Sequence, residues 1–359
     1  MNSAVSSTGF SVAKPLDTAC VQFGGPSFET RAFKNLAFEA GVFGTGGPGP
    51  SLDPVRQWRI HIGAHETASP DLRRALAALR PELAARGVDA IPRAVGFAEA
   101  MLHRPFGAWL PLIGRRATAR RISAPLEMLR RGPDTLVLSE DRLLGSPRRA
   151  FSEPFYPLAG QVAQMLATLA GPGPGRNTGR GAEVTLFLSI RGFQDHLPAI
   201  YARELRALPP PAGGFDAIKR RVLARPPSWF DLVRRLRAAA PGVTLRVWRS
   251  EDYAAHPEAI LSAFIGCDTG AARPFGGGAE GSSSEDWPPP VEAVREAEAL
   301  PADLAQPARR ALVEEIFAAA GPGTPFRPFS TVEQGAFEAA YAADVERIAA
   351  LGQGILIRP

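Results

Sequence analysis

The chain has 359 residues, of which 45% are hydrophobic and 21% charged, so it can bury the core of one large domain or of two smaller ones. Its 36 glycines and 35 prolines make up about a fifth of the residues, below the roughly 25–30% that is typical of disordered chains. The net charge of +5 does not predict a nucleic-acid partner, because the basic residues are interleaved with acidic ones and no nucleic-acid-binding motif accompanies them.

The first 55 residues are rich in glycine, serine and proline and predict an irregular N-terminal extension, 1–55. The remainder, 56–359, alternates apolar runs with helical patterns and predicts an α/β domain. Its first apolar run, Arg59–Gly63, predicts a strand. Four leucines at spacings of four, three and four predict a helix after it: Leu72, Leu76, Leu79 and Leu83. Pro81 is expected to interrupt this helix.

Three further apolar runs predict strands: Thr135–Ser139, Val184–Ile190 and Val243–Val247. A helical pattern follows the second of these, with Asp195 as its expected N-cap. A stretch rich in glycine, serine and proline predicts a flexible insert at 270–290. Beyond it, a helical tail is expected over 291–351.

Strands that alternate with helices predict a central parallel sheet flanked by helices on both faces. In such sheets, ligands bind beyond the carboxyl ends of the strands. The candidate site residues therefore lie directly after the predicted strands: His61–Asp71, Ser139–Arg142, Arg191–Tyr201 and Arg249–Asp252.

The junction after the first strand has the outline of an anion-binding loop. Free backbone N–H groups and the positive end of a helix dipole meet there, and Thr67 and Ser69 add hydroxyl groups. The phosphate-binding pattern G-x-x-x-x-G-K-[ST] is nevertheless absent, because Gly63 has no second glycine or lysine at the required spacing. An anion site and an ordinary helix start therefore remain open as interpretations of these residues.

Four segments, taken together and in order, resemble bacterial sulfotransferases that use 3′-phosphoadenosine 5′-phosphosulfate (PAPS). These segments are "IHIGAHETASPDLRRAL", "LVLSEDRL", "EVTLFLSIRGFQDHLPAIYARELR" and "WFDLVRRLRAAAPGVTLRVWRSEDY", within about residues 58–266. The resemblance implies a P-loop nucleoside-triphosphate-hydrolase-like architecture, PAPS as the cofactor and no metal ion. It assigns Gly63, Thr67 and Ser69 to the cofactor loop and Arg191 to the grip on the 3′-phosphate.

The sequence departs from the family pattern at three positions. Glu66 stands where the family has the lysine that neutralises the phosphosulfate, and a carboxylate there would repel the leaving oxygen. Pro70 removes one N–H donor from the loop. Ala199 replaces the serine expected to contact the 3′-phosphate. Arg73 and Arg74, one turn into the helix, are candidates to replace the missing lysine.

Sulfuryl transfer also needs a general base that deprotonates an acceptor hydroxyl, and histidine or glutamate can serve. The candidates near the predicted strand ends are His65, Glu66, Glu140 and His196. No histidine or cysteine spacing predicts a metal site, and the two cysteines, Cys20 and Cys267, stand far apart.

Two functional hypotheses follow. In the first, the chain transfers the sulfuryl group of PAPS to a hydroxyl of a glycan, lipid or small metabolite. In the second, it keeps the fold but has lost catalysis and serves as a binding or scaffold protein. Without a leader pattern or an apolar run of about 18 residues, the sequence predicts a cytoplasmic protein with no membrane span.

Overall fold

A five-stranded sheet forms the centre of the protein. The computed structural model describes residues 55–91, 134–170, 181–269, 289–321 and 323–359. The strands are β1 (Gln57–His61), β2 (Val88–Ile91), β3 (Thr135–Ser139), β4 (Glu183–Ile190) and β5 (Thr244–Arg249). All four pairings are parallel, which confirms the predicted α/β fold with a central parallel sheet.

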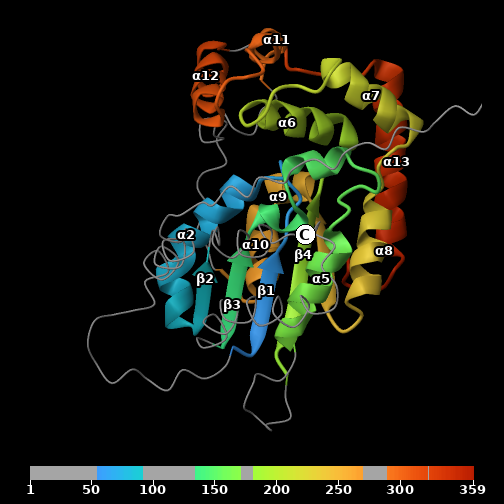
Figure 1. Ribbon diagram of the computed structural model, residues 1–359. Coiled ribbons are helices and arrows are strands. Elements are labelled where there is room, and N and C mark those ends of the chain that lie inside the picture. Colours follow the sequence, from blue (N-terminus) through green and yellow to red (C-terminus); the bar gives the residue numbers. More distant parts are fainter. Residues whose placement is uncertain (1–54, 92–133, 171–180, 270–288, 322) are drawn as a thin grey trace, which may run out of the picture.

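The strand order is β2-β3-β1-β4-β5, so the first strand of the chain lies in the middle of the sheet (Figure 1). Trp58 of β1 pairs with Leu136 of β3 on one side and with Val184 of β4 on the other. The chain builds the sheet on one side of β1 with β2 and β3, and then crosses to the other side with β4 and β5. The carboxyl end of β1 is therefore the switch point at which a ligand crevice is expected in this class of sheet.

The four predicted strands are confirmed, with shifts of one or two residues at some ends. Thr135–Ser139 has its predicted bounds, whereas β1 begins at Gln57 and ends at His61. The strand that the sequence did not predict is β2, which has only four residues and contains the polar Asp89. A run this short carries too little alternation to be recognised as a strand.

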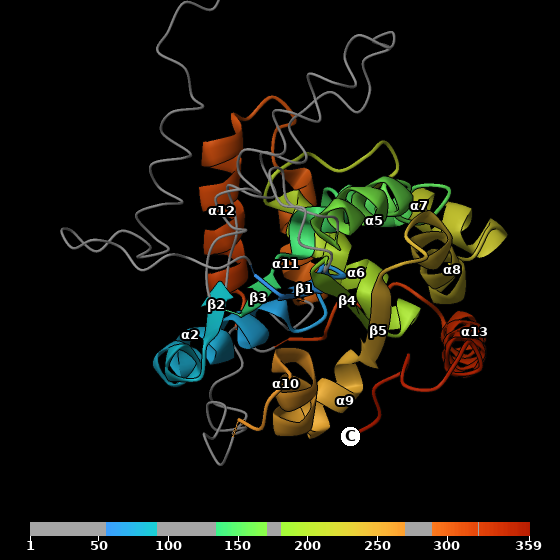
Figure 2. The ribbon, with the colours of Figure 1, turned by 90° about the horizontal axis from the view of Figure 1, so that it is seen from below.

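Helices cover both faces of the sheet (Figure 2). On one face lie α2 (Ser69–Ala85), α9 (Ser250–Ala255) and α10 (Pro257–Ile265). On the other lie α5 (Ala159–Ala167), α6 (Phe193–Leu205), α8 (Trp229–Ala239) and α13 (Thr331–Ala349). Near the carboxyl ends of the strands are the 3-10 turns η1 (Asp141–Leu144) and η2 (Pro147–Phe151). The remaining elements are η3 (Thr168–Ala170), α7 (Gly214–Ala224), α11 (Val291–Ala299) and α12 (Gln306–Ala319).

The two faces have separate hydrophobic cores because successive side chains of a strand point to opposite sides. In β4, Leu186 and Leu188 belong to the core beneath α5, α6 and α8, whereas Phe187 belongs to the core beneath α2 and α10. In β3, Leu138 and Val137 divide in the same way. The strands are therefore apolar on both faces, as buried parallel strands are.

Two helix predictions are wrong in detail. Pro81 lies inside α2 and does not end it, because the buried Leu76, Leu79 and Leu83 hold the helix against the sheet across the missing N–H group. Asp195 lies within the first turn of α6, whose N-cap is Gly192.

The expected helical tail is present as α11, α12 and α13. The predicted extension 1–55 and insert 270–290 lie outside the described residues, apart from Val55 and the last two residues of the insert. No helix of the described part of the chain is long and apolar enough to cross a membrane.

Candidate functional site

The loop between β1 and α2 crosses the switch point of the sheet in a conformation with three left-handed residues. Gly63 has φ +112°, and a Cβ there would come within 3.1 Å of the backbone oxygen of Asp141, so glycine is required. Glu66 and Ala68 have φ of 55° and 63° although they carry side chains. The backbones of Gly63 and Ala64 are anchored to Ser189 by hydrogen bonds of 2.7 and 3.0 Å, which extend the pairing of β1 with β4.

A ladder of buried polar side chains supports this loop across the three central strands. Nδ1 of His61 lies 2.9 Å from Oγ of Ser139, and its Nε2 lies 3.1 Å from Oγ of Ser189. Thr67 contacts Ser189 and donates its hydroxyl proton to the carbonyl oxygen of Ala64 at 2.7 Å.

Each hydroxyl group can donate only one proton, and this determines which group donates in each hydrogen bond of the ladder. Because Thr67 donates to Ala64, Ser189 must donate to Thr67, and His61 must carry its proton on Nε2. Burial lowers the pKa of His61 to about 3, which keeps the ring neutral at pH 7. The ladder is therefore a fully satisfied neutral network that holds Thr67 in place.

Above the ladder, the charged side chains form a chain of ion pairs. Nη1 of Arg203 lies 2.8 Å from Oε1 of Glu66 and 3.3 Å from Oδ2 of Asp141. On the far side of Asp141, Nη1 of Arg73 lies 3.6 Å from Oδ1. Burial alone would raise the pKa of Asp141, but Arg203 and Arg73 hold it well below its usual range. Each of the four charged side chains in this series of ion pairs therefore has a partner of opposite charge within the protein.

Arg191 approaches the same loop from the carboxyl end of β4. Its Nη1 donates to the carbonyl oxygen of Glu66 at 3.0 Å, and its own carbonyl accepts a hydrogen bond from Nε1 of Trp229 at 2.9 Å. Among the described residues, no carboxylate forms an ion pair with Arg191. The structure therefore brings Arg191 and the predicted loop residues together, with the Arg191 charge unmatched by those residues.

The loop backbone retains donors that could meet an anion. Within the described ranges, no backbone or side-chain group accepts a hydrogen bond from the N–H of Glu66, Thr67 or Ala68. These three groups directly precede the first turn of α2, where the helix dipole adds positive potential. Successive N–H groups with residues in the left-handed region form the type of concavity that binds anions.

One buried histidine, His65, lies in the loop, and a second, His196, lies beside it on α6. His65 stacks on Tyr156, with its Nδ1 3.1 Å from the tyrosine oxygen, and burial lowers its pKa to about 3. Its Nε2 has no partner among the described residues. His196, on α6, packs between Phe155 and Trp229, and neither of its ring nitrogens has a partner in the described part of the chain. Burial holds the pKa of His196 well below its usual value.

The remaining predicted residues divide between the loop and other places. Glu140 is buried and accepts hydrogen bonds from the backbone and side chain of Arg142, at 3.1 and 3.3 Å, and burial raises its pKa. Ser69 and Pro70 begin α2, and Ser69 lies 3.5 Å from the carbonyl of Ala64. Arg74 pairs with Asp71 on the outer surface of α2, so it does not reach the loop.

Arg203 is the site residue that the sequence reasoning missed, whereas Asp141 lies within the predicted range Ser139–Arg142 but was given no role of its own. Asp141 directly follows Glu140 at the end of β3, where a carboxylate is expected to face the crevice. Arg203 gives no comparable signal, because it lies 137 residues from Glu66 and inside an ordinary helical pattern. Ala199 is buried in the same helix.

No cluster of three or more histidine, cysteine, aspartate or glutamate side chains within the described ranges could hold a metal ion. Comparison with family models, curated proteins and solved structures finds no match to the chain.

Proposed function

We propose that the chain is a sulfotransferase-like protein of the P-loop type that binds an anionic nucleotide weakly and does not transfer its sulfuryl group, so that it acts as a binding or scaffold protein. The observation that carries the proposal is the chain of ion pairs from Glu66 through Arg203 and Asp141 to Arg73. The position of the loop at the switch point, between the central strand and a long helix, supports the nucleotide as the ligand class.

Electrostatics disfavours catalysis at this loop. Negative charge develops on the leaving oxygen during sulfuryl transfer, and a cation aimed at that oxygen is often worth several kcal/mol. Arg203 and Arg73 both pair with carboxylates of the protein, so neither charge is unmatched. The Glu66 carboxylate taken alone would repel a unit negative charge ~4 Å away by about 4 kcal/mol at an effective dielectric constant near 20. Its pairing with Arg203 offsets part of that repulsion but leaves no net positive charge for the phosphosulfate.

The candidate bases are also poorly suited to the reaction. A base works best with a pKa near the working pH, whereas the pKa of His65 is about 3. Its Nδ1 is already engaged with Tyr156, so Nε2 could act as the base only in the tautomer in which Nδ1 carries the ring proton. Glu140 has a raised pKa, but one carboxylate oxygen is engaged by Arg142.

A second candidate, PAPS-dependent transfer to a hydroxyl of a glycan, lipid or small metabolite, is favoured by two other observations. The three unbonded N–H groups of the loop and the Arg191 charge could together hold a phosphate. In that case the Arg203 side chain would leave Glu66 for the cofactor on binding. The two candidates agree on the ligand class and differ on whether chemistry follows.

The test is a calorimetric titration with 3′-phosphoadenosine 5′-phosphate, the desulfated cofactor, at low and high salt. The informative variant is Glu66→Gln, which removes the charge but retains an oxygen that Arg203 can contact. A lysine at this position would face Arg203 and is a poorer choice. We expect weak binding by the natural protein and binding about tenfold tighter by the variant, equivalent to 1.4 kcal/mol. Glu314→Gln, in an exposed pair with Arg310, is the matched control and should change nothing.

Incubation of both proteins with radiolabelled PAPS and a panel of hydroxyl acceptors separates the two candidates. Sulfated product formed by the natural protein above the rate without protein would refute the non-catalytic proposal. Tight nucleotide binding by the natural protein, with no gain in the variant, would show that Glu66 does not oppose the ligand. No binding by either protein would refute the nucleotide as the ligand class.

A further inference from the structure

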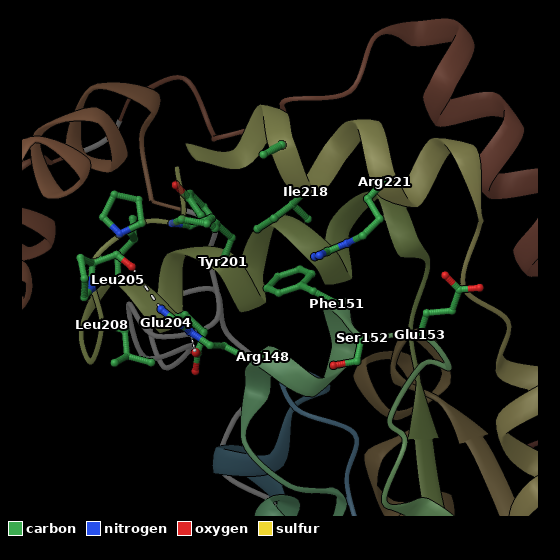
Figure 3. A pocket seen from close by; sticks show the side chains of 14 residues that line it. Arg148, Phe151, Ser152, Glu153, Tyr201, Glu204, Leu205, Leu208, Ile218 and Arg221 are labelled. Carbon is green, nitrogen blue, oxygen red and sulfur yellow. Dashed lines mark hydrogen bonds and ion pairs between the residues drawn. The ribbon is translucent and has the colours of Figure 1, made fainter. Parts of the chain in front are cut away.

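A cavity apart from the β1–α2 loop lies between η2, α6 and α7. It is a cavity of about 400 Å³, in the range of small-molecule sites. Its apolar wall comes from Leu205 at the end of α6, Leu208 just after it, Phe151 of η2 and Ile218 of α7. Pro209, Pro210 and Pro211 continue this wall after α6 and add no N–H donors. Figure 3 shows the side chains of Leu205, Leu208, Phe151 and Ile218 around the cavity.

Most charged groups of the cavity are matched by neighbouring residues. Nε of Arg148 lies 2.9 Å from Oε2 of Glu204, and Nη1 of Arg225, outside the cavity, lies 2.7 Å from both carboxylate oxygens of Glu153. The hydroxyl of Tyr201 donates to the carboxylate of Glu298. These pairs leave little polar capacity for a ligand.

Arg221 is the exception. It extends from α7 toward Phe151 (Figure 3), and no described residue forms an ion pair or a side-chain hydrogen bond with its guanidinium. It also lines an adjoining smaller cavity, which shares Phe151, Ser152 and Glu153 with the first. The charge therefore lies where the two cavities meet, next to an apolar wall and in contact with water.

We propose that this cavity binds an amphipathic monoanion, an alkyl carboxylate whose chain lies along the apolar wall and whose head group pairs with Arg221. A single unmatched cation favours a ligand with one negative charge. A carboxylate fits the planar fork of a guanidinium through two parallel hydrogen bonds. Because the guanidinium faces water, the chain supplies most of the affinity and the ion pair selects the sign of the head group. The proposal is independent of the nucleotide loop.

Calorimetry on the full chain, with octanoate, decanoate, decanol and decyltrimethylammonium below their aggregation concentrations, tests the proposal. We expect decanoate to bind more tightly than decanol, and decyltrimethylammonium to bind most weakly. Each added CH₂ group should tighten carboxylate binding by about fourfold, until the wall is covered. Arg221→Gln should weaken decanoate binding by about two- to fivefold and leave decanol binding unchanged.

Two further variants make the test specific. Arg220→Gln removes a neighbouring charge of α7 that does not line the cavity, and should leave decanoate binding unchanged. Leu208→Asn alters an exposed part of the wall, where folding is least affected, and should weaken decanoate and decanol alike by about three- to tenfold. Glu66→Gln, at the loop, should affect neither ligand. Absence of decanoate binding, equal binding of the anionic and cationic ligands, or no effect of Arg221→Gln would each overturn the proposal.

Discussion

The ion-pair chain at the β1–α2 loop and the cavity beside α6 differ in whether their charged groups have partners within the protein. At the loop, Arg203 is shared by two carboxylates, Glu66 and Asp141, and the histidines beneath and beside it are neutral. At the cavity, Arg221 has no such partner among the described residues. One helix borders both places, since Arg203 of α6 points to the loop and the adjacent Glu204 lines the cavity. The contrast indicates that buried charges matched internally build the structure, whereas a charge left unmatched at an opening is available to a ligand.

The largest expected effect is a pH dependence of the free energy of unfolding, caused by the buried neutral histidines at the loop, His61 and His65. The folded-state pKa values of His61 and His65 are about 3, below the unfolded value of 6.5, so the unfolded state binds more protons between these limits. Their stabilisation is complete above pH 6.5 and is lost as the pH falls toward 3. At pH 5, His61 and His65 each lower the free energy of unfolding by about 2 kcal/mol relative to neutral pH. His196 lowers it further, because its pKa is also depressed.

Glu140 and Glu204 act in the opposite direction, because their raised pKa values make them take up protons more readily in the folded state. We expect the free energy of unfolding in urea to be lower by about 4 kcal/mol at pH 5 than at pH 7.5. Equal stability at the two pH values would mean that the histidines titrate in the folded protein, and the loop would then not be a neutral, water-excluding region.

The second effect concerns the centre of the ion-pair chain. Arg203→Leu leaves Glu66 and Asp141 without their shared cation, with only Arg73 still near Asp141. Breaking a fully buried pair typically costs 3–5 kcal/mol, and the Arg203 side chain is 31% exposed, so we expect a loss of about 2–4 kcal/mol. Urea unfolding at pH 7.5 provides the measurement.

Arg310→Leu is the control, since Arg310 and Glu314 form an exposed pair one turn apart, and we expect it to change stability by less than about 0.5 kcal/mol. Similar losses in the two variants would mean that the loop pairs are as weak as surface pairs. Arg203 would then be free to leave Glu66 and Asp141 for an incoming anion, as the second candidate requires.

The residues of the loop could be predicted from the sequence, but their electrostatic state could not. Apolar runs such as Thr135–Ser139 predicted the strands, and the end of each strand predicted which residues meet at the switch point. The contact of Arg191 with the carbonyl of Glu66 agrees with that reasoning. The pairing of Glu66 with Arg203 depends on the angle at which α6 crosses the loop, and no local pattern encodes that angle.

The third effect is a gain in stability at His196. Both ring nitrogens are buried without a partner among the described residues. The ring packs against Phe155 and Trp229, with distances between ring centroids of 6.3 and 5.0 Å. Replacing an unsatisfied buried polar group by an apolar one of similar shape removes its desolvation cost, so we expect His196→Phe to stabilise the protein by about 1–2 kcal/mol. The variant should also lose part of the pH dependence described above. Destabilisation at pH 7.5 would indicate that the imidazole has a partner that Phe cannot replace.

The smallest expected effect is a change in decanoate affinity when the positive charge at the cavity is increased. Glu153 lines the opening and binds Arg225 through both carboxylate oxygens, at 2.7 Å each. Glu153→Gln would release the Arg225 charge beside Arg221, and a second unmatched cation should tighten decanoate binding by about two- to threefold at low salt. The gain should disappear at 1 M salt, where the Debye length is about 3 Å, whereas the dependence on chain length should persist. Calorimetry at both salt concentrations therefore separates the ionic contribution from the apolar one. If the variant binds decanoate no better than the natural protein at low salt, the head group lies away from this end of the cavity.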